Sequence, residues 1–420
     1  MKLATLSYSK IVIDEIQSYN AELLAYIIYG LRTIVDVGGK FAILTATLPP
    51  FILDALNEEL GKISEENGRE KSVNIPNVKY NSFIEGKDRH NVKAIENEEI
   101  NADDIYSHYK KKRGKTLVIC NTVKKAQELY SKLKEKVNEE KDFKEVELEL
   151  LHAKFIKRDR LRKENDIVEF GRTENKGNKI WITTSLVEAS LDVDFDYLFT
   201  ELNDLSGFFQ RLGRVNRKGT KKIDETNAYV YLNINENLIT GEDRSKGFID
   251  KTIYETSKEA LKGFNGIISE KKKFELINEN LTSEKLRNSN FVNDFEDKKE
   301  NLRNLRKGVL TKKDVIKEFR NIISFKAIPR AVYEKNKEKI NEIISEYNLA
   351  DNEEEREKAR IEMNSYTLSL RVYEILKDKK NILKIGNEII YIANGEYSEE
   401  VGFQRNKKRL MDQIINIVDV

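Results

Sequence analysis

The 420-residue chain is poor in cysteine, histidine and proline, with one, three and four of each. The single cysteine, Cys120, excludes an internal disulfide and a cysteine-based zinc site, and it is typical of a reducing cytoplasm. The longest apolar run, near Leu23–Leu31, is too short for a membrane span and is bounded by Glu22 and Arg32. The N-terminal residues also lack the apolar core of a signal peptide. We therefore expect a cytoplasmic protein without a membrane segment.

Net charge is also nearly absent. The chain has 74 basic and 72 acidic residues, which gives a net charge of +2. This balance does not by itself indicate a polyanionic partner, so any nucleic-acid surface must come from local arrangement. The many Lys- and Glu-rich runs are typical of solvated helix faces.

The first 50 residues have a strand–helix–strand pattern. Apolar runs predict strands over Ile11–Ile13 and Phe41–Leu44, the first in a buried parallel sheet, and a helical period predicts a helix over Asn20–Val37. Parallel strands bring their carboxyl ends to one sheet edge, where polar side chains follow both runs. These side chains belong to Asp14, Glu15, Thr45 and Thr47.

A carboxylate at such an edge can hold Mg²⁺ through water, and a neighbouring one can polarise an attacking water. An Asp-Glu pair alone is a weak signal in so acidic a chain, and Asp224-Glu225 is a second pair with no strand before it. Position distinguishes Asp14-Glu15, because an apolar run precedes the pair and Gln17 follows it.

A second α/β region begins near Arg89 and ends near Leu232. Apolar runs predict four strands there, over Thr116–Cys120, Leu148–His152, Ile180–Thr183 and Tyr197–Thr200. Thr122 lies where the first of these strands leads into a helix, and a helix N-terminus is suited to binding phosphate.

The residues beyond Asn233 have mainly helical, charge-rich patterns. A capping box at Thr311-x-x-Asp314 predicts a helix through Phe319, and short strands are expected at Glu388–Ile392 and near Tyr397. This pattern indicates a separate, mainly helical accessory domain.

Gln210, Arg214 and Arg217 have the spacing i, i+4 and i+7. A helix would place all three on one face, where an amide and two guanidinium groups can bind phosphate oxygens. Gly213 would keep the space beside that face clear.

Four segments resemble motifs II, III, V and VI of superfamily 2 helicases. They are VIDEIQ (Val12–Gln17), TATLP (Thr45–Pro49), TSLVEASLDVD (Thr184–Asp194) and QRLGRVNR (Gln210–Arg217). Further segments narrow the resemblance to the helicase–nuclease of type I CRISPR interference. They are the LLHAKFIKRDR run, in which Leu151 is the second leucine, and the C-terminal segments Phe319–Lys337 and Asn394–Phe403.

The resemblance implies an α/β fold with two RecA-like parallel-sheet lobes, the first one incomplete, and a C-terminal accessory domain. The expected boundaries are 1–87 for the truncated first lobe, 88–232 for the second lobe and 233–420 for the accessory domain. The implied cofactors are ATP and Mg²⁺, and the implied partners are single-stranded DNA and the type I CRISPR interference complex.

In the first lobe, the resemblance implies that Asp14 coordinates Mg²⁺ through water and that Glu15 activates the hydrolytic water. Gln17 would help to couple the two lobes. Thr45 and Thr47 would link the nucleotide state to lobe closure.

In the second lobe, the resemblance implies that Gln210, Arg214 and Arg217 reach the phosphates, beside Gly213. The two arginines would be arginine fingers, which contribute roughly 10³–10⁵ in rate to phosphoryl transfer. Asp192 would approach the ribose.

Thr122 and Thr184 would contact the nucleic-acid backbone. Taken alone, each threonine is more often a plain strand-end residue, so these two assignments depend on the motifs around them.

The phosphate loop expected of such a helicase, G-x-x-x-x-G-K-[ST], is absent from the sequence. The only Gly-Lys-Thr, Gly114–Thr116, has Tyr109 where the first glycine belongs and leads into a strand. None of the three histidines, His90, His108 and His152, is followed by aspartate, so we expect neither a His-Asp nuclease centre nor a transition-metal site.

Three explanations remain open at this point. The chain is the C-terminal part of a longer or split helicase–nuclease whose phosphate loop and nuclease lie elsewhere, in the same gene or on a separate chain. Alternatively, it is a non-catalytic subunit that binds DNA or the interference complex, or the product of a decayed gene. The sequence upstream of codon 1 would discriminate between them.

Overall fold

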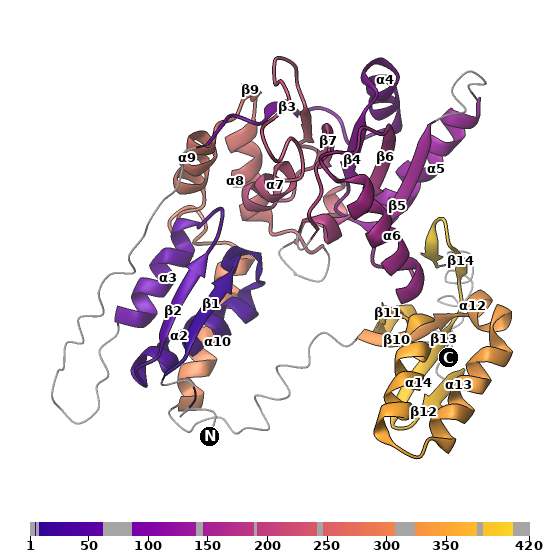
Figure 1. Cartoon of the computed structure of the whole chain (residues 1–420). Coiled ribbons are helices and arrows are strands. Elements are labelled where there is room, and N and C mark those ends of the chain that lie inside the picture. The colour runs from indigo at the N-terminus through magenta and orange to yellow at the C-terminus, as the bar shows by residue number, and fades with distance from the viewer. Residues whose placement is uncertain are drawn as a thin grey trace, which may run out of the picture. The chain divides into compact units, whose positions relative to one another are not determined.

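The structure is a computed structural model, which describes residues 5, 8–61, 86–139, 146–188, 191–241, 247–306, 324–375 and 381–405 (Figure 1). The chain divides into two compact units. Unit 1 comprises Met1–Ile100 and Asp196–Val315, and unit 2 comprises Asn101–Phe195 and Ile316–Val420. In the described residues, no helix is both long and apolar enough to cross a bilayer.

Unit 1 begins with the predicted strand–helix–strand pattern. Strands β1 (Lys10–Asp14) and β2 (Lys40–Leu44) pair in parallel, with Asp14 opposite Leu44. Helix α2 (Ala21–Asp36) lies between them in sequence and starts at Asn20, whose side chain accepts a hydrogen bond from the Leu23 amide. A short 3-10 turn, η1 (Ile16–Ser18), follows β1, and α3 (Pro50–Gly61) follows β2.

Only one face of the β1–β2 pair packs into a core. Ile11, Ile13 and Ile43 contact the buried cluster formed by α2 and α3. On the other face, the side chains of Val12 and Leu44 are 61% and 58% exposed. The prediction that β1 is a strand of a buried sheet is therefore wrong for one face, because no described element covers it. Parallel sheets are ordinarily covered on both faces.

A helix from much later in the chain completes this core. Helix α10 (Asn290–Arg306) packs along α2 and contributes Phe295 and Leu302 to the same cluster. Arg303 donates a 2.6 Å hydrogen bond to Glu59 of α3, whose side chain is 1% exposed. Residues expected in the accessory domain thus pack against α2 and α3 of unit 1.

The remaining strands of unit 1 run in the order β7, β8, β3, β9. The first three are parallel and β9 is antiparallel to β3. Their bounds are Tyr197–Glu201, Ala228–Tyr231, Asn91–Ile95 and Asn265–Ile267. Unit 1 also contains three more α-helices and a 3-10 turn among its described residues: α7 (Leu205–Leu212), α8 (Lys251–Leu261), α9 (Glu270–Asn280) and η4 (Glu236–Leu238).

Unit 2 holds a parallel sheet with the strand order β5, β6, β4. These strands span Glu147–Leu151, Lys179–Thr183 and Lys115–Ile119, as predicted to within a residue at each end. Three helices and one 3-10 turn accompany them: α4 (Ala102–Lys112), α5 (Val123–Glu139), α6 (Lys157–Phe170) and η3 (Ser185–Val187).

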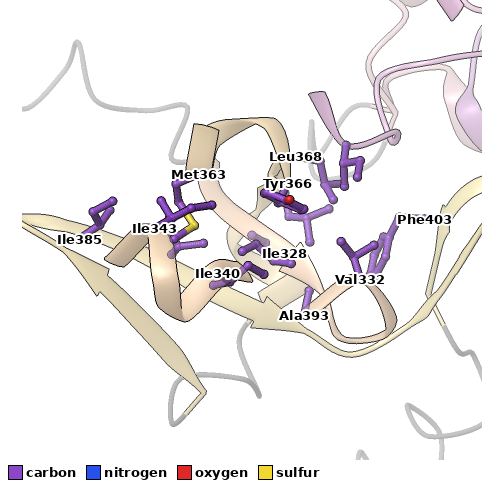
Figure 2. Packing of buried hydrophobic residues seen from close by; sticks show 14 of the residues in the cluster. Ile328, Val332, Ile340, Ile343, Met363, Tyr366, Leu368, Ile385, Ala393 and Phe403 are labelled. Carbon is purple, nitrogen blue, oxygen red and sulfur yellow. The ribbon is translucent and has the colours of Figure 1, made fainter. Parts of the chain in front are cut away.

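The C-terminal part of unit 2 is a mixed α/β layer. Its sheet has the order β11, β10, β13, β12, and β10 and β13 are parallel. Those strands span Leu368–Arg371, Ser324–Pro329, Glu388–Ala393 and Ile382–Ile385. The helices are α12 (Arg330–Lys335), α13 (Lys337–Leu349), α14 (Glu353–Ser365) and α15 (Val372–Ile375). Figure 2 shows their apolar core, in which Ile340 and Ile343 of α13 and Met363 of α14 gather with the sheet residue Ile328.

A hairpin of β14 (Glu396–Ser398) and β15 (Gly402–Gln404) ends the described chain. The predicted strands at Glu388–Ile392 and Tyr397 are confirmed, and a four-stranded sheet accompanies the expected helices. The capping box at Thr311–Asp314 lies outside the described residues. The domain boundaries at residues 87 and 232 stay a prediction. The two compact units divide the chain differently, because β3, β7 and β8 fall in unit 1 whereas β4, β5 and β6 fall in unit 2.

We predict that Glu59→Gln destabilises the α2–α3–α10 core. Removing the charge leaves Arg303, and Arg32 at 3.4 Å, without their buried counter-ion, which costs about 3 kcal/mol. Hydrogen exchange of α2 and α10 amides measures this loss. The matched control is Glu300→Gln, because Glu300 contacts the same Arg303 at 3.9 Å but is exposed, and it should change stability by under about 0.5 kcal/mol. Equal effects of the two substitutions would contradict the prediction.

Candidate functional site

The carboxyl ends of β1 and β2 bring four of the predicted site residues together. Thr45 Oγ1 lies 2.6 Å from Gln17 Oε1 and 3.2 Å from a carboxylate oxygen of Glu15, and Gln17 donates to the same Glu15 carboxylate. The Thr45 hydroxyl is also 2.8 Å from the Thr47 carbonyl and accepts from the Thr47 amide. One hydroxyl proton cannot satisfy three acceptors at once, so Thr45 can exchange partners among them.

Glu15 is held in an unusual backbone conformation. Its φ of 50° and ψ of 55° lie in the left-handed region, which non-glycine residues seldom occupy. The amide of Glu15 donates a 2.8 Å hydrogen bond to the Leu44 carbonyl, which continues the β1–β2 ladder. Local strain of this kind, maintained by surrounding hydrogen bonds, is typical of functional sites.

Two features of this edge fit a bound nucleotide–metal group. Asp14 is exposed at the end of β1, where its carboxylate can offer an oxygen to a hydrated cation. Thr47 Oγ1 is buried and has no hydrogen-bond partner among the described residues. Buried polar atoms are normally paired, so this hydroxyl is available to a ligand.

The predicted helical face of Gln210, Arg214 and Arg217 is wrong. Helix α7 ends at Leu212 with Gly213 as its C-cap, so only Gln210 lies on the helix. Arg214 and Arg217 lie in the segment that follows, residues 213–221, which we call the arginine loop. After Leu212 the amides of Arg214 and Val215 donate to the carbonyls three residues earlier, which tightens the chain into a turn. Asn216 then adopts a φ of 44°, with its side chain bonded to the backbone of Lys221.

Gly213 itself has ordinary helical angles, with φ of −58°. A Cβ atom at this position would lie 3.1 Å from the Gln210 carbonyl oxygen, so glycine removes a tight contact with the helix's own last turn.

Arg211 is a residue that the sequence reasoning missed. Its side chain is 2% exposed and donates to the Thr200 hydroxyl at 2.9 Å and the Glu201 carbonyl at 2.6 Å. It fastens α7 to the end of β7. The sequence pattern that could have identified Arg211 is its position three residues after Phe208, on the apolar side of the helix.

In unit 2, Thr122 and Thr184 follow the neighbouring parallel strands β4 and β6 at the same sheet edge. The Thr122 hydroxyl accepts a 3.1 Å hydrogen bond from the Lys125 amide and so helps to start α5. Thr184 is buried at the N-cap of η3, and Asp192 is exposed.

His152, at the end of β5, has a structural role. Its Nε2 donates to the Val401 carbonyl at 3.0 Å and its Nδ1 accepts from the Lys154 amide at 3.1 Å. Burial lowers the pKa of His152 to about 4, so the ring is neutral near pH 7. Gln127 also donates to the Val401 carbonyl, at 2.9 Å, which docks the β14–β15 hairpin on α5 and β5.

These features define the class of the protein. Parallel sheets flanked by helices, with acidic and hydroxyl side chains at the strand ends, form the RecA-like α/β fold of helicase lobes. Residues 112–220 match the family model "CRISPR-associated nuclease/helicase Cas3, C-terminal". Over these residues the chain is similar to the C-terminal part of Cas3 proteins.

Relatives and solved structures agree with this placement. The chain is 27% identical over 271 residues to Cas3 of Methanothermobacter thermautotrophicus, which covers 62% of this chain and 29% of that protein. It is 31% identical over 244 residues to Cas3 of Streptococcus thermophilus, with 53% and 25% covered. The T. fusca Cas3-ATP crystal structure superposes with a TM-score of 0.66 at 15% identity, over 97% of this chain and 53% of that one. The matched part is under a third of the length of each of these two curated relatives.

We predict that unit 2 loses stability between pH 6.5 and pH 4 because of His152. The folded pKa lies below the unfolded value of 6.5, so the stabilisation is complete above pH 6.5 and falls by about 1.4 kcal/mol per pH unit below it. Urea unfolding followed through the buried Trp181 should show a loss of about 2 kcal/mol at pH 5. His152→Gln, which cannot titrate, should flatten this slope. An unchanged slope in the variant would rule out His152 as the cause.

Proposed function

We propose that the chain is the helicase portion of a type I CRISPR interference effector. Combined with a first-lobe segment that carries a phosphate loop, it would translocate on and unwind DNA with hydrolysis of ATP. The observation that carries the proposal is the hydrogen-bonded set of Glu15, Gln17 and Thr45 at the ends of β1 and β2. The match of residues 112–220 to the Cas3 family model, and the fold similarity to the T. fusca Cas3-ATP structure over 97% of the chain, support the same assignment.

At the β1–β2 edge, Asp14 would hold Mg²⁺ through water and Glu15 would accept a proton from the attacking water. Bound Mg-ATP would supply the phosphoanhydride bond that is hydrolysed. Thr45 can switch between Glu15 and Gln17, so a change at the carboxylate would be passed to Gln17 and to Thr47. This change of hydrogen-bond acceptor by the Thr45 hydroxyl supports the proposed link between nucleotide state and lobe closure.

The arginine loop would complete the phosphate site. Gln210, Arg214 and Arg217 would contact phosphate oxygens, and the two guanidinium groups would stabilise charge in the transition state. Because Arg214 and Arg217 lie beyond the end of α7, the helix does not fix the directions of their side chains. Gly213 would lie beside them, and Asp192 would approach the ribose.

The nucleic-acid contacts are proposed for Thr122 and Thr184, which share one edge of the unit 2 sheet. Single-stranded DNA would pass this edge. A structure titled "CRISPR RNA-guided surveillance complex, pre-nicking" matches the chain with a TM-score of 0.57 at 14% identity. By analogy, we propose the type I interference complex as a partner.

A second chain or segment would supply the phosphate loop and the His-Asp nuclease region. The exposed face of Val12 and Leu44 supports this, because it offers apolar surface on which further elements of the first lobe can pack. We accordingly propose residues 1–87 as part of a first lobe, 88–232 as the second lobe and 233–420 as the accessory domain.

A non-catalytic binding subunit is the second candidate. The observation in its favour is the missing phosphate loop. An adjacent reading frame that encodes the loop and a His-Asp domain would favour the catalytic proposal.

We predict negligible ATPase activity for this chain by itself, and recovery of DNA-stimulated activity when a fragment with the missing first-lobe half is added. In the mixture, Arg214→Ala and Glu15→Ala should each lower kcat by about 10³-fold, since one removes a transition-state cation and the other the water-activating base. The assay is phosphate release with and without single-stranded DNA.

Lys218→Ala is the matched control, because Lys218 is an exposed cation in the same loop and has no proposed catalytic role. It should keep at least half of the activity. Robust hydrolysis by the pure chain, or full activity of both variants in the mixture, would refute the role assignment.

A further inference from the structure

The arginine loop is fastened to one short segment, Arg89-His90, by hydrogen bonds to consecutive residues. His90 Nε2 donates to the Val215 carbonyl at 2.9 Å, and Arg89 Nη1 donates to the Arg217 carbonyl at 2.9 Å. Between them, Asn216 Nδ2 donates to the Arg89 carbonyl at 3.1 Å. Carbonyl groups of the loop accept two of these bonds and Asn216 donates the third, so these contacts hold the path of the loop backbone.

Glycine at position 219 lets the same segment pack closely. Gly219 has a φ of 62°, and a Cβ atom there would lie 3.2 Å from Cγ of Arg89. The aliphatic part of Arg89 therefore lies directly against the loop. Its guanidinium group reaches past the loop to Glu270, at 2.6 Å.

Helix α9 holds both residues of the segment in place. Lys273 donates to His90 Nδ1 at 3.1 Å and to Glu270 at 2.9 Å, while Glu270 also accepts from Arg89. His90 is fully buried and Lys273 is 5% exposed. The ammonium group can only donate, so His90 must accept at Nδ1 and carry its proton on Nε2, which is the tautomer that bonds the Val215 carbonyl.

Two cations of this cluster, Arg89 and Lys273, share one carboxylate, that of Glu270. Burial alone would raise the pKa of Glu270, but Lys273 and Arg89 hold it at about 2, so the carboxylate is ionised. Burial and the neighbouring Lys273 lower the pKa of His90 to about 3, so the ring is neutral. Glu270 therefore stays ionised and His90 stays neutral throughout the neutral pH range.

We propose that four side chains outside the helicase motifs act as positioning residues for the arginine loop: Arg89, His90, Glu270 and Lys273. They set the backbone from which Arg214 and Arg217 extend, and α9 is the element that supports them. This inference rests on the proposed function for its catalytic consequence, whereas its structural content concerns the loop alone.

The test is hydrogen exchange in the complete chain carrying Lys273→Met, which keeps the length of the side chain but removes the donor to His90. Two amides report on the loop: Gly219, which donates to the Asn216 carbonyl, and Lys221, which donates to Asn216 Oδ1. Both should exchange about tenfold faster. The Leu202 amide, which donates to Tyr231 in the sheet of the same unit, should change by less than about twofold.

Lys271→Met is the matched control, because Lys271 is an exposed lysine of the same helix. Arg89→Lys is a second variant, since lysine keeps the charge but lacks the planar fork that serves both Glu270 and the Arg217 carbonyl. If Lys273→Met does not fold, the same hydrogen-exchange measurement is made on Arg89→Lys. In the reconstituted ATPase, each positioning variant should lower kcat about tenfold and leave KM within about twofold.

Unchanged exchange at Gly219 and Lys221 would overturn the proposal, as would equal acceleration at Leu202, which would indicate general destabilisation. Faster exchange at Gly219 and Lys221, with the exchange of Leu202 nearly unchanged, supports the proposal. If Arg214→Ala retains full hydrolysis while Lys273→Met loosens the loop, the positioning role stands and the catalytic role of the arginines falls.

Discussion

The hydrogen bond from the Glu15 amide to the Leu44 carbonyl carries the β1–β2 ladder one step beyond the last strand residue. The chain then turns into a left-handed conformation, and this turn brings the Glu15 carboxylate to Thr45 and Gln17 while Asp14 stays exposed. Two adjacent carboxylates thereby acquire different surroundings. Different proposed tasks, metal binding and proton transfer, follow from this difference in environment.

The backbone of the arginine loop is held in place in a different way. Here no ladder is available, and the backbone is fixed by side chains that come from an earlier segment and from α9. Arg211 adds a buried attachment to β7. The cations proposed to act on phosphate are therefore carried on a loop whose supporting side chains are hydrogen-bonded to one another. Such a support limits the reorganisation that would otherwise accompany catalysis.

The sequence was sufficient for elements with a strong local period. Strands β4 to β7 and helices α2 and α5 lie where apolar spacing predicted them, and the polar residues at the ends of β1 and β2 do meet. The path after α7 was not predictable, because Asn216 takes its positive φ from bonds to Arg89 and Lys221, and the former is more than a hundred residues away. Exposure of Val12 was also missed, since an apolar run does not reveal how many strands flank it.

Helix α10 bears on how the chain is made. The apolar face of α2 packs against α3, which follows it closely, and against α10, which begins more than 250 residues after α2 ends. At about 5–20 residues per second, a ribosome needs on the order of ten to fifty seconds to add that stretch. During this interval α3 and the two strands can pack on the nascent α2, but the part of its surface that α10 later contacts has no partner yet. Synthesis of unit 1 thus includes an interval in which a chaperone or another chain can bind α2 before α10 does.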